Sequence, residues 1–216
     1  MKNIGAKTIF LLACAVVFAA CADASLYSDP AAMAGYTGRT SINIIQSGVE
    51  LKADVEYAVY APGTYSGNDL TSGNEYIYAY QIFNSLKSDV AVDFFSVGII
   101  SPATVSTIYT DDTYGYNPGT GVEPLLSKIF AQSAGFVFAG QNLNPRQWSS
   151  VLIFSSVHSP TIGFGTVSGG GLCGMGSLPT PAILPEPATI VMIMPALLAL
   201  RNKNKNTAGS KKPAKK

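Results

Sequence analysis

The chain has 216 residues, of which 47% are hydrophobic and only 12% charged, with 21 glycines, 13 prolines and 11 tyrosines. This composition is too apolar and aromatic for a disordered chain, and it favours short strands joined by turns over long helices. The formal net charge is +1, but residues 25–184 hold five basic and eleven acidic residues, a net charge of −6 that disfavours nucleic-acid binding.

Residues 1–24 have the three parts of a secretory signal peptide. Two lysines precede an apolar run, and Ala22 and Ala24 then place small residues at the −3 and −1 positions of a cleavage site. Signal peptidase is therefore expected to cut after Ala24, so that the exported chain begins at Ser25. Two alternatives stay open: an uncut N-terminal anchor, and a lipoprotein modified at Cys21, which follows a lipobox-like Phe-Ala-Ala stretch.

The next clear pattern is the alternation of residues 49–60. Apolar or aromatic side chains occupy the odd positions from Val49 to Val59, and charged side chains occupy the even positions from Glu50 to Glu56. A period of two predicts a strand with one buried and one solvated face. Residues 75–83 are apolar or aromatic on both faces, which predicts a central strand of the same sheet.

Other short apolar segments complete an all-β pattern. Turns rich in Gly, Pro and Asn separate them, and the segment 123–134 stays ambiguous and could form a helical turn. The pattern predicts a single β-sandwich or jelly-roll-like domain over residues 25–167, flanked by an N-terminal signal helix and a short C-terminal transmembrane helix. The additional strands are predicted at 41–46, 90–97, 104–109, 135–139, 149–154 and 161–167.

Few side chains in this domain have the chemistry of an active site. The only histidine, His158, has no Gly-x-Ser-x-Gly elbow to partner it, and Cys173, the one cysteine left after cleavage, has no basic neighbour. No phosphate-binding loop follows the glycines of 163–176, which with the prolines of 178–187 predict a linker over 168–184. No catalytic, cofactor or metal residue is therefore assigned, and no cofactor is expected.

Two pairs of residues in predicted loops are candidate binding or catalytic groups. Asn68-Asp69 and Asp111-Asp112 offer oxygen ligands for Ca²⁺, but neither pair has the D-x-D-x-D-G spacing of a calcium loop. Two carboxylates could also catalyse glycoside hydrolysis, although nothing in the pattern singles out a pair. Solvated loop acids are the simpler interpretation of both.

The C-terminal region begins with a proline-rich break and ends in basic residues. Pro185-Glu186-Pro187-Ala188-Thr189 leads into an apolar run that ends at Leu200, and Arg201, Lys203 and Lys205 follow. The basic residues predict a cytoplasmic terminus. The run of 13 residues from Ala188 would span about 20 Å as a helix, less than the ~30 Å hydrocarbon core, so insertion in the inner membrane is expected to be transient.

This order of parts resembles the PEP-CTERM sorting signal of Gram-negative-type bacteria. The resemblance covers residues 185–205, leaves 206–216 as a basic tail, and departs from the pattern in its short apolar run and in basic residues that alternate with Asn. It implies recognition and cleavage by an exosortase, a membrane transpeptidase. The aromatic segments that start at Tyr76 and Trp148 are similar to those of β-rich passengers found ahead of such tails.

Together these patterns predict an exported cell-surface or extracellular-matrix protein with a non-enzymatic structural or interaction domain. Its expected partners are signal peptidase, an exosortase-like transpeptidase and, as a candidate ligand, extracellular polysaccharide. Two alternatives remain. The domain could be a carbohydrate-binding or adhesive module that uses exposed aromatic side chains, or it could be a secreted hydrolase.

Overall fold

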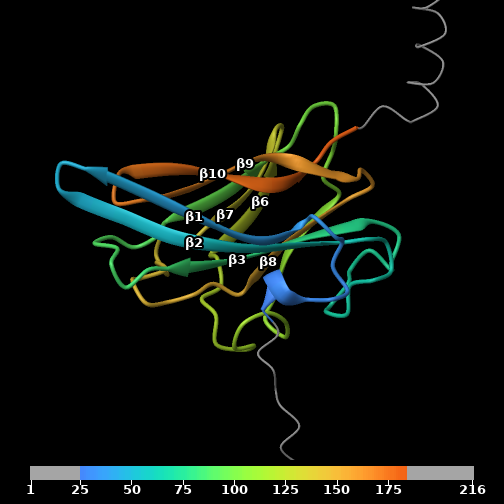
Figure 1. The fold of residues 1–216 in the computed structure, drawn as a ribbon, viewed down its shortest axis with the longest axis horizontal. Coiled ribbons are helices and arrows are strands. Elements are labelled where there is room, and N and C mark those ends of the chain that lie inside the picture. Colours follow the sequence, from blue (N-terminus) through green and yellow to red (C-terminus); the bar gives the residue numbers. More distant parts are fainter. Residues whose placement is uncertain (1–24, 184–216) are drawn as a thin grey trace, which may run out of the picture. The chain divides into compact units, whose positions relative to one another are not determined.

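The computed structural model describes residues 25–183 (Figure 1). The predicted signal peptide with Ala22 and Ala24, the alternative lipid site at Cys21, and the predicted sorting signal all lie outside these residues. Within them, the only helical element is the three-residue 3₁₀ helix η1 (Leu26–Ser28). No helix in residues 25–183 has the length and apolar character needed to cross a bilayer.

Ten strands form two five-stranded antiparallel sheets, which confirms the predicted all-β class. The first sheet has the order β1 (Thr37–Gln46), β2 (Val49–Tyr60), β3 (Tyr76–Asn84), β8 (Val151–Ser156) and β5 (Thr107–Asp111). The second has the order β10 (Leu172–Pro181), β9 (Pro160–Gly169), β4 (Phe94–Gly98), β7 (Ser133–Val137) and β6 (Leu126–Phe130).

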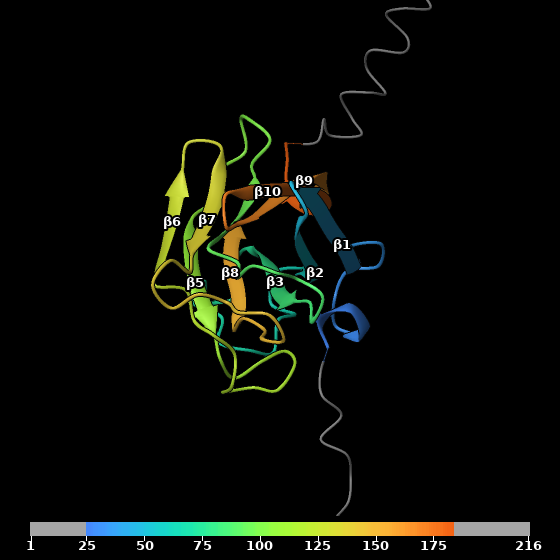
Figure 2. The same cartoon turned by 90° about the vertical axis from the view of Figure 1, so that its left-hand side faces the viewer.

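The main hydrophobic core lies between the two sheets. Tyr78 stacks on Phe154 with ring centroids 4.9 Å apart, and Tyr80 lies 5.7 Å from Phe95 of the facing sheet. Figure 2 shows that the sheets approach each other at their sides, where β1 lies beside β10. There Thr40 Oγ1 donates a hydrogen bond of 2.8 Å to the carbonyl of Ser177. The core is thus enclosed by the two sheets and also by the contact between their edge strands β1 and β10.

The strand predicted over 49–60 is confirmed, but its outer face is solvated only in part. Lys52 and Asp54 are half-exposed, whereas Glu56, Ala58 and Tyr60 on the same face are buried. The alternation records which side chains share a face, but it contains no information on what covers that face. The prediction of one wet face is therefore correct for the first half of β2 and wrong for the second.

A second hydrophobic cluster explains this burial, because it lies on the outer face of the first sheet. It consists of Leu26, Ala58, Tyr60, Tyr65, Ile77, Ala79, Val151 and Ile153. Leu26 belongs to the segment of residues 25–36, and Tyr65 belongs to the loop between β2 and β3. Both cover the sheet from outside, so β3 buries its two faces, as predicted from its two apolar sides.

The predicted linker over residues 168–184 is wrong. β9 runs to Gly169, β10 pairs with it over its whole length, and the described residues up to Ala182, starting at Ser25, belong to one compact unit. The glycines of β9 are a packing requirement, since a Cβ atom on Gly165 would overlap the side chain of Leu178. The prolines of β10 are tolerated because it is an edge strand.

The ambiguous segment 123–134 contains a strand and no helical turn. β6 occupies Leu126–Phe130 and pairs with β7 as the edge of the second sheet. Its side chains are mostly exposed, so it lacks the buried apolar alternation that marks the other strands. Because β10 ends at Pro181, the β domain extends beyond the predicted boundary at residue 167.

Candidate functional site

A cavity of about 470 Å³ opens on the outer face of the first sheet, beside the second hydrophobic cluster. Its volume is within the ~300–1,000 Å³ range of small-molecule sites. Three strands, the N-terminal segment and the loops before β6 and β8 contribute its walls. The lining residues are Ser25, Tyr27, Arg39, Glu56, Phe83, Tyr116 and Trp148.

The register of β1, β2 and β3 places the polar side chains in a row. Arg39 of β1 is opposite Glu56 of β2, and Glu56 is opposite Gln81 of β3. Asp54 and Phe83 form the next pair along β2 and β3. Because directly paired residues point to the same face, all five side chains lie on the outside of the sheet.

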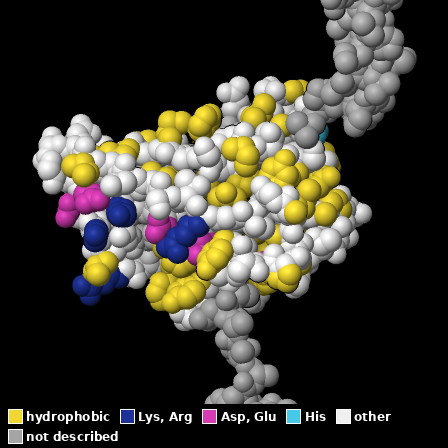
Figure 3. All heavy atoms as spheres, viewed as in Figure 1, with side chains coloured by type: hydrophobic (Ala, Val, Ile, Leu, Met, Phe, Trp, Pro, Cys, Tyr) yellow, Lys and Arg dark blue, Asp and Glu magenta, His cyan; other side chains and the backbone are white. Residues whose placement is uncertain are grey.

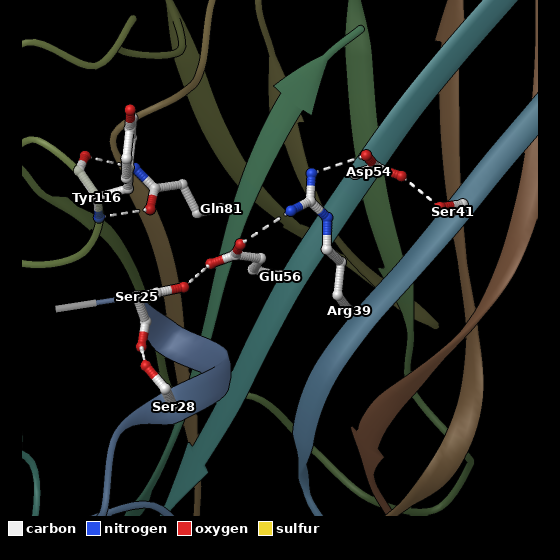
Figure 4. Close-up of polar contacts among 8 residues, drawn as sticks. All are labelled: Ser25, Ser28, Arg39, Ser41, Asp54, Glu56, Gln81 and Tyr116. Carbon is white, nitrogen blue, oxygen red and sulfur yellow. Dashed lines mark hydrogen bonds and ion pairs between the residues drawn. The ribbon is translucent and has the colours of Figure 1, made fainter. Parts of the chain in front are cut away.

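Arg39 connects the two carboxylates of this row. Its Nη2 lies 2.7 Å from Asp54 Oδ2, and its Nη1 lies 3.5 Å from Glu56 Oε1 (Figure 4). The guanidinium carbon also lies 5.4 Å from the centre of the Phe83 ring. Two opposite charges and one aromatic face thus hold a side chain that is otherwise half-exposed.

Glu56 is the buried acid of the site, with a relative exposure of 3%. Burial raises the pKa of Glu56, and a hydrogen bond from Ser25 Oγ together with the charge of Arg39 only partly opposes this. Figure 4 shows the carboxylate between Ser25 and Arg39. Its oxygens therefore face the cavity as hydrogen-bond acceptors that are already oriented.

Three aromatic rings form the other wall of the cavity. Phe83 and Tyr116 pack edge to face with centroids 5.6 Å apart, and Tyr116 packs in the same way on Trp148 at 5.2 Å. Gln81 holds the Tyr116 backbone: its Oε1 accepts from the Tyr116 N–H at 2.8 Å, and its Nε2 donates to the Tyr116 carbonyl at 3.2 Å. The aromatic loop is therefore attached to the centre of the sheet.

Trp148 also lines a second cavity, of about 260 Å³. Here its neighbours are Thr120, Val122, Arg146 and Gln147. Arg146 has φ of 73°, in the left-handed region, and its N–H donates to the carbonyl of Asn84 at 2.9 Å. Trp148 Nε1 is buried without a hydrogen-bond acceptor in the described residues. One tryptophan side chain is thus common to both cavities.

Figure 3 shows how charge is distributed on the face that carries η1. The Lys, Arg, Asp and Glu side chains visible there lie in the left half of the view, toward the turn of the β1–β2 hairpin, and the right half shows mainly hydrophobic and uncharged side chains.

Asp111, one of the acids expected to be solvated in a loop, is instead the buried last residue of β5, and it holds the loop that contains Asn68. Asp111 Oδ2 accepts from the Asn68 N–H and from Tyr65 Oη, both at 2.8 Å, and its Oδ1 accepts from Thr113 N at 2.9 Å. Burial raises the pKa of Asp111, but these hydrogen bonds outweigh it and lower the pKa. Residues 25–183 contain no group of three His, Cys, Asp or Glu side chains placed to hold a metal ion.

His158 and Cys173 lie away from the cavity walls. The backbone N–H of His158 donates to Ser156 Oγ at 3.1 Å, and Ser156 Oγ itself donates to the carbonyl of Thr104 at 2.6 Å. The nearby serine is therefore bonded to backbone groups. Cys173 is an exposed free thiol on β10, opposite Ser168 of β9.

Sequence reasoning did not identify the residues that line the cavity as a group. Arg39, Glu56, Phe83 and Trp148 lie on four segments that are far apart in the chain, and no local motif connects them. The sequence contains only a partial signal of this site: Glu56 and Phe83 occupy positions of β2 and β3 that face away from the core. The sequence-predicted sorting residues Pro185–Thr189, Arg201, Lys203 and Lys205 lie outside the described residues.

No family model, curated protein or solved structure matches the chain.

Proposed function

We propose that this chain is an exported protein of the cell surface or extracellular matrix, and that its β domain is a non-enzymatic interaction module. The observation that carries the interaction role is the cavity on the first sheet, which combines aromatic rings with an oriented Arg–Glu pair. The lining acid Glu56 and the neighbouring Asp54 are each bonded to Arg39 and to a serine hydroxyl. Such acids are suited to holding a ligand in place.

The proposed export and sorting of the chain are inferred from the two ends of the sequence. Signal peptidase would release the chain after Ala24, and the apolar run from Ala188 to Leu200 would hold it transiently in the inner membrane. An exosortase-like transpeptidase would then recognise Pro185–Thr189 and transfer the domain outward. The basic residues that start at Arg201 would stay in the cytoplasm.

The test of delivery is replacement of Pro185, Glu186 and Pro187 by alanine. The variant keeps the apolar run, so uncut precursor should accumulate in the inner membrane, as measured by mass spectrometry of cell fractions. The matched control replaces Lys211, Lys212 and Pro213 by alanine and should be processed like the wild type. Normal processing of the first variant would contradict the sorting proposal.

The aromatic cavity favours a second, more specific candidate, a carbohydrate-binding or adhesive module. Aromatic rings beside oriented polar groups are the usual components of a small-molecule site. A secreted hydrolase is the weaker candidate, and it would show an activity that is lost on replacing one carboxylate or His158. Saccharide binding without turnover separates the two.

The pairing order supports a jelly-roll-like topology for the domain. β3 pairs with β8 in the first sheet, and β4 pairs with β7 in the second. These pairs nest around β5 and β6, and the chain passes from one sheet to the other after β3, β4, β5, β7 and β8, as in Greek-key folds. Jelly rolls serve as binding domains in lectins, which agrees with an interaction role.

A further inference from the structure

We propose that the two cavities on either side of Trp148 form one groove that binds an extended, uncharged glycan. This inference rests on the proposed interaction role and names the class of ligand. Trp148 lines both the cavity of about 470 Å³ and the cavity of about 260 Å³. A ligand that touches both must be elongated, and it must cross an indole ring.

The apolar part of the groove suits a sugar ring. A pyranose presents C–H groups on its faces and hydroxyl groups around its rim, so it can stack on an aromatic ring while its rim stays polar. Trp148 is partly exposed, and Tyr116 packs on it edge to face at 5.2 Å. Gln81 in turn fixes Tyr116 through two backbone hydrogen bonds. The stacking surface is therefore held in place before a ligand arrives.

The polar part suits hydroxyl groups. Arg39 has five N–H donors, and its contacts with Asp54 and Glu56 engage one at each of its Nη atoms. The oxygens of Glu56 accept hydrogen bonds, and Ser25 Oγ, which donates its one hydrogen to Glu56, can accept a further bond from a ligand. A sugar hydroxyl is both donor and acceptor, so it can accept from Arg39 and donate to Glu56 or Ser25 in addition to the contacts that these groups make with one another, which an apolar ligand cannot do.

The charges of the groove favour a neutral ligand. Among the described residues, the two cations that line the groove, Arg39 and Arg146, are matched by the lining acid Glu56 and by Asp54, which pairs with Arg39 next to the larger cavity. The five basic and eleven acidic residues of 25–184 give a net charge of −6 around it. A polyuronate or phosphorylated glycan would be repelled. A quaternary ammonium group would have to share the Phe83 ring with the Arg39 guanidinium, which lies 5.4 Å from its centre.

Trp148 makes the proposal directly measurable, because it is the only tryptophan of the chain. The exported protein is titrated with neutral β-glucan oligosaccharides of two to six sugars, with alginate as a polyuronate and with choline as an ammonium probe. A saturable change in tryptophan emission is expected with the neutral oligosaccharides only. Saturation by alginate or choline, without saturation by any neutral glycan, would overturn the proposal.

Variants locate the ligand within the groove. Trp148→Ala should weaken glycan binding by roughly ten- to hundredfold in calorimetry. The matched control is Phe164→Ala, which removes an exposed aromatic ring from β9 of the other sheet and should bind like the wild type. Equal losses in both variants, with unchanged circular dichroism spectra, would overturn the assignment to this groove.

The two cavities predict different effects on short and long ligands. Arg146 is exposed and lines only the smaller cavity, so Arg146→Ala should weaken binding of the longest oligosaccharides several-fold and leave the disaccharide unchanged. An equal effect on all lengths would contradict a continuous groove. These measurements use purified protein, whereas the sorting test follows processing in cells. Either test can fail while the other succeeds, so the glycan-binding proposal and the sorting proposal are tested separately.

Discussion

At the scale of single residues, Glu56 has the most unusual environment among the acids of the site. It lies on the face of β2 that alternation predicts to be solvated, yet the N-terminal segment covers it and Ser25 donates a hydrogen bond to it. Burial of a carboxyl group disfavours its charged form, and Arg39 at 3.5 Å compensates only in part. Two predictions follow from this position.

The first is a pH dependence of stability. Because the pKa of Glu56 is raised on folding, the free energy it contributes is fully present below its unfolded value and is lost as pH rises through the folded value. Glu56→Gln cannot ionise, so the variant should lose less stability than the wild type as the pH rises above the unfolded value of about 4.3. Chemical unfolding at a series of pH values measures it, with Glu123→Gln as the control. Parallel curves for wild type and Glu56→Gln would contradict the burial argument.

The second concerns the new N-terminus. Cleavage after Ala24 would create an α-ammonium group on Ser25, whose hydroxyl already contacts Glu56. We expect a chain that begins at Ser25 to be more stable at neutral pH than one with a single extra N-terminal residue, by roughly 0.2–1 kcal/mol. Thermal unfolding of both forms measures the difference. It should vanish in Glu56→Gln, and persistence there would show that another group is responsible.

At the scale of elements, the hairpin of β9 and β10 shows why glycine does not always indicate flexibility. Gly165 gives room to Leu178 of the neighbouring strand, and the turn is made by Gly170 and Gly171, with φ of 58° and 81°. The same residues appear in the sequence as a glycine-rich, proline-rich stretch. They form a strand pair because the second sheet supplies partners that no local pattern can show.

Gly165→Ala tests this packing role. The added Cβ would overlap Leu178, so the variant should lose roughly 1–3 kcal/mol of unfolding free energy, as measured by denaturant titration. Ser168→Ala is the matched control, because it changes a half-exposed position of the same strand and should have little effect. If residues 168–184 were a linker, Gly165→Ala would be tolerated as well as the control.

At the scale of the whole domain, the first sheet is covered on both sides. Its inner face packs on the second sheet, and its outer face supports a separate cluster closed by residues 25–36 and the loop after β2. Tyr60 donates to Asp29 of the N-terminal segment at 2.8 Å, and Tyr114 also bonds to Asp29. The start of the described chain is thus part of the folded domain and of the cavity wall.

Leu26→Ala should therefore destabilise the domain although it lies next to the predicted cleavage site. Leu26 is fully buried, and its truncation should cost about 2–4 kcal/mol by leaving a void in the outer cluster. Tyr27→Ala is the matched control, since Tyr27 is half-exposed on the cavity wall, and it should change stability far less. Thermal unfolding of a chain that begins at Ser25 decides whether this segment is part of the folded domain.

The sequence by itself determined the all-β class and several strands, because period-two alternation is a local property of an extended chain. It correctly placed β2, and it identified β3 as central from its two apolar faces. It missed β6 and β10, whose partners lie elsewhere in the chain and whose own patterns are weak. The predictions for both ends rest on the sequence alone.

Only the tertiary structure decided which outward faces are buried and which side chains meet at the cavity. Glu56 and Lys52 share one face of one strand, yet one is buried and the other half-exposed, because the N-terminal segment covers only one end of that face. Arg39 and Trp148 are more than a hundred residues apart and line the same cavity. Strand register and covering loops are long-range contacts, and no local sequence pattern encodes them.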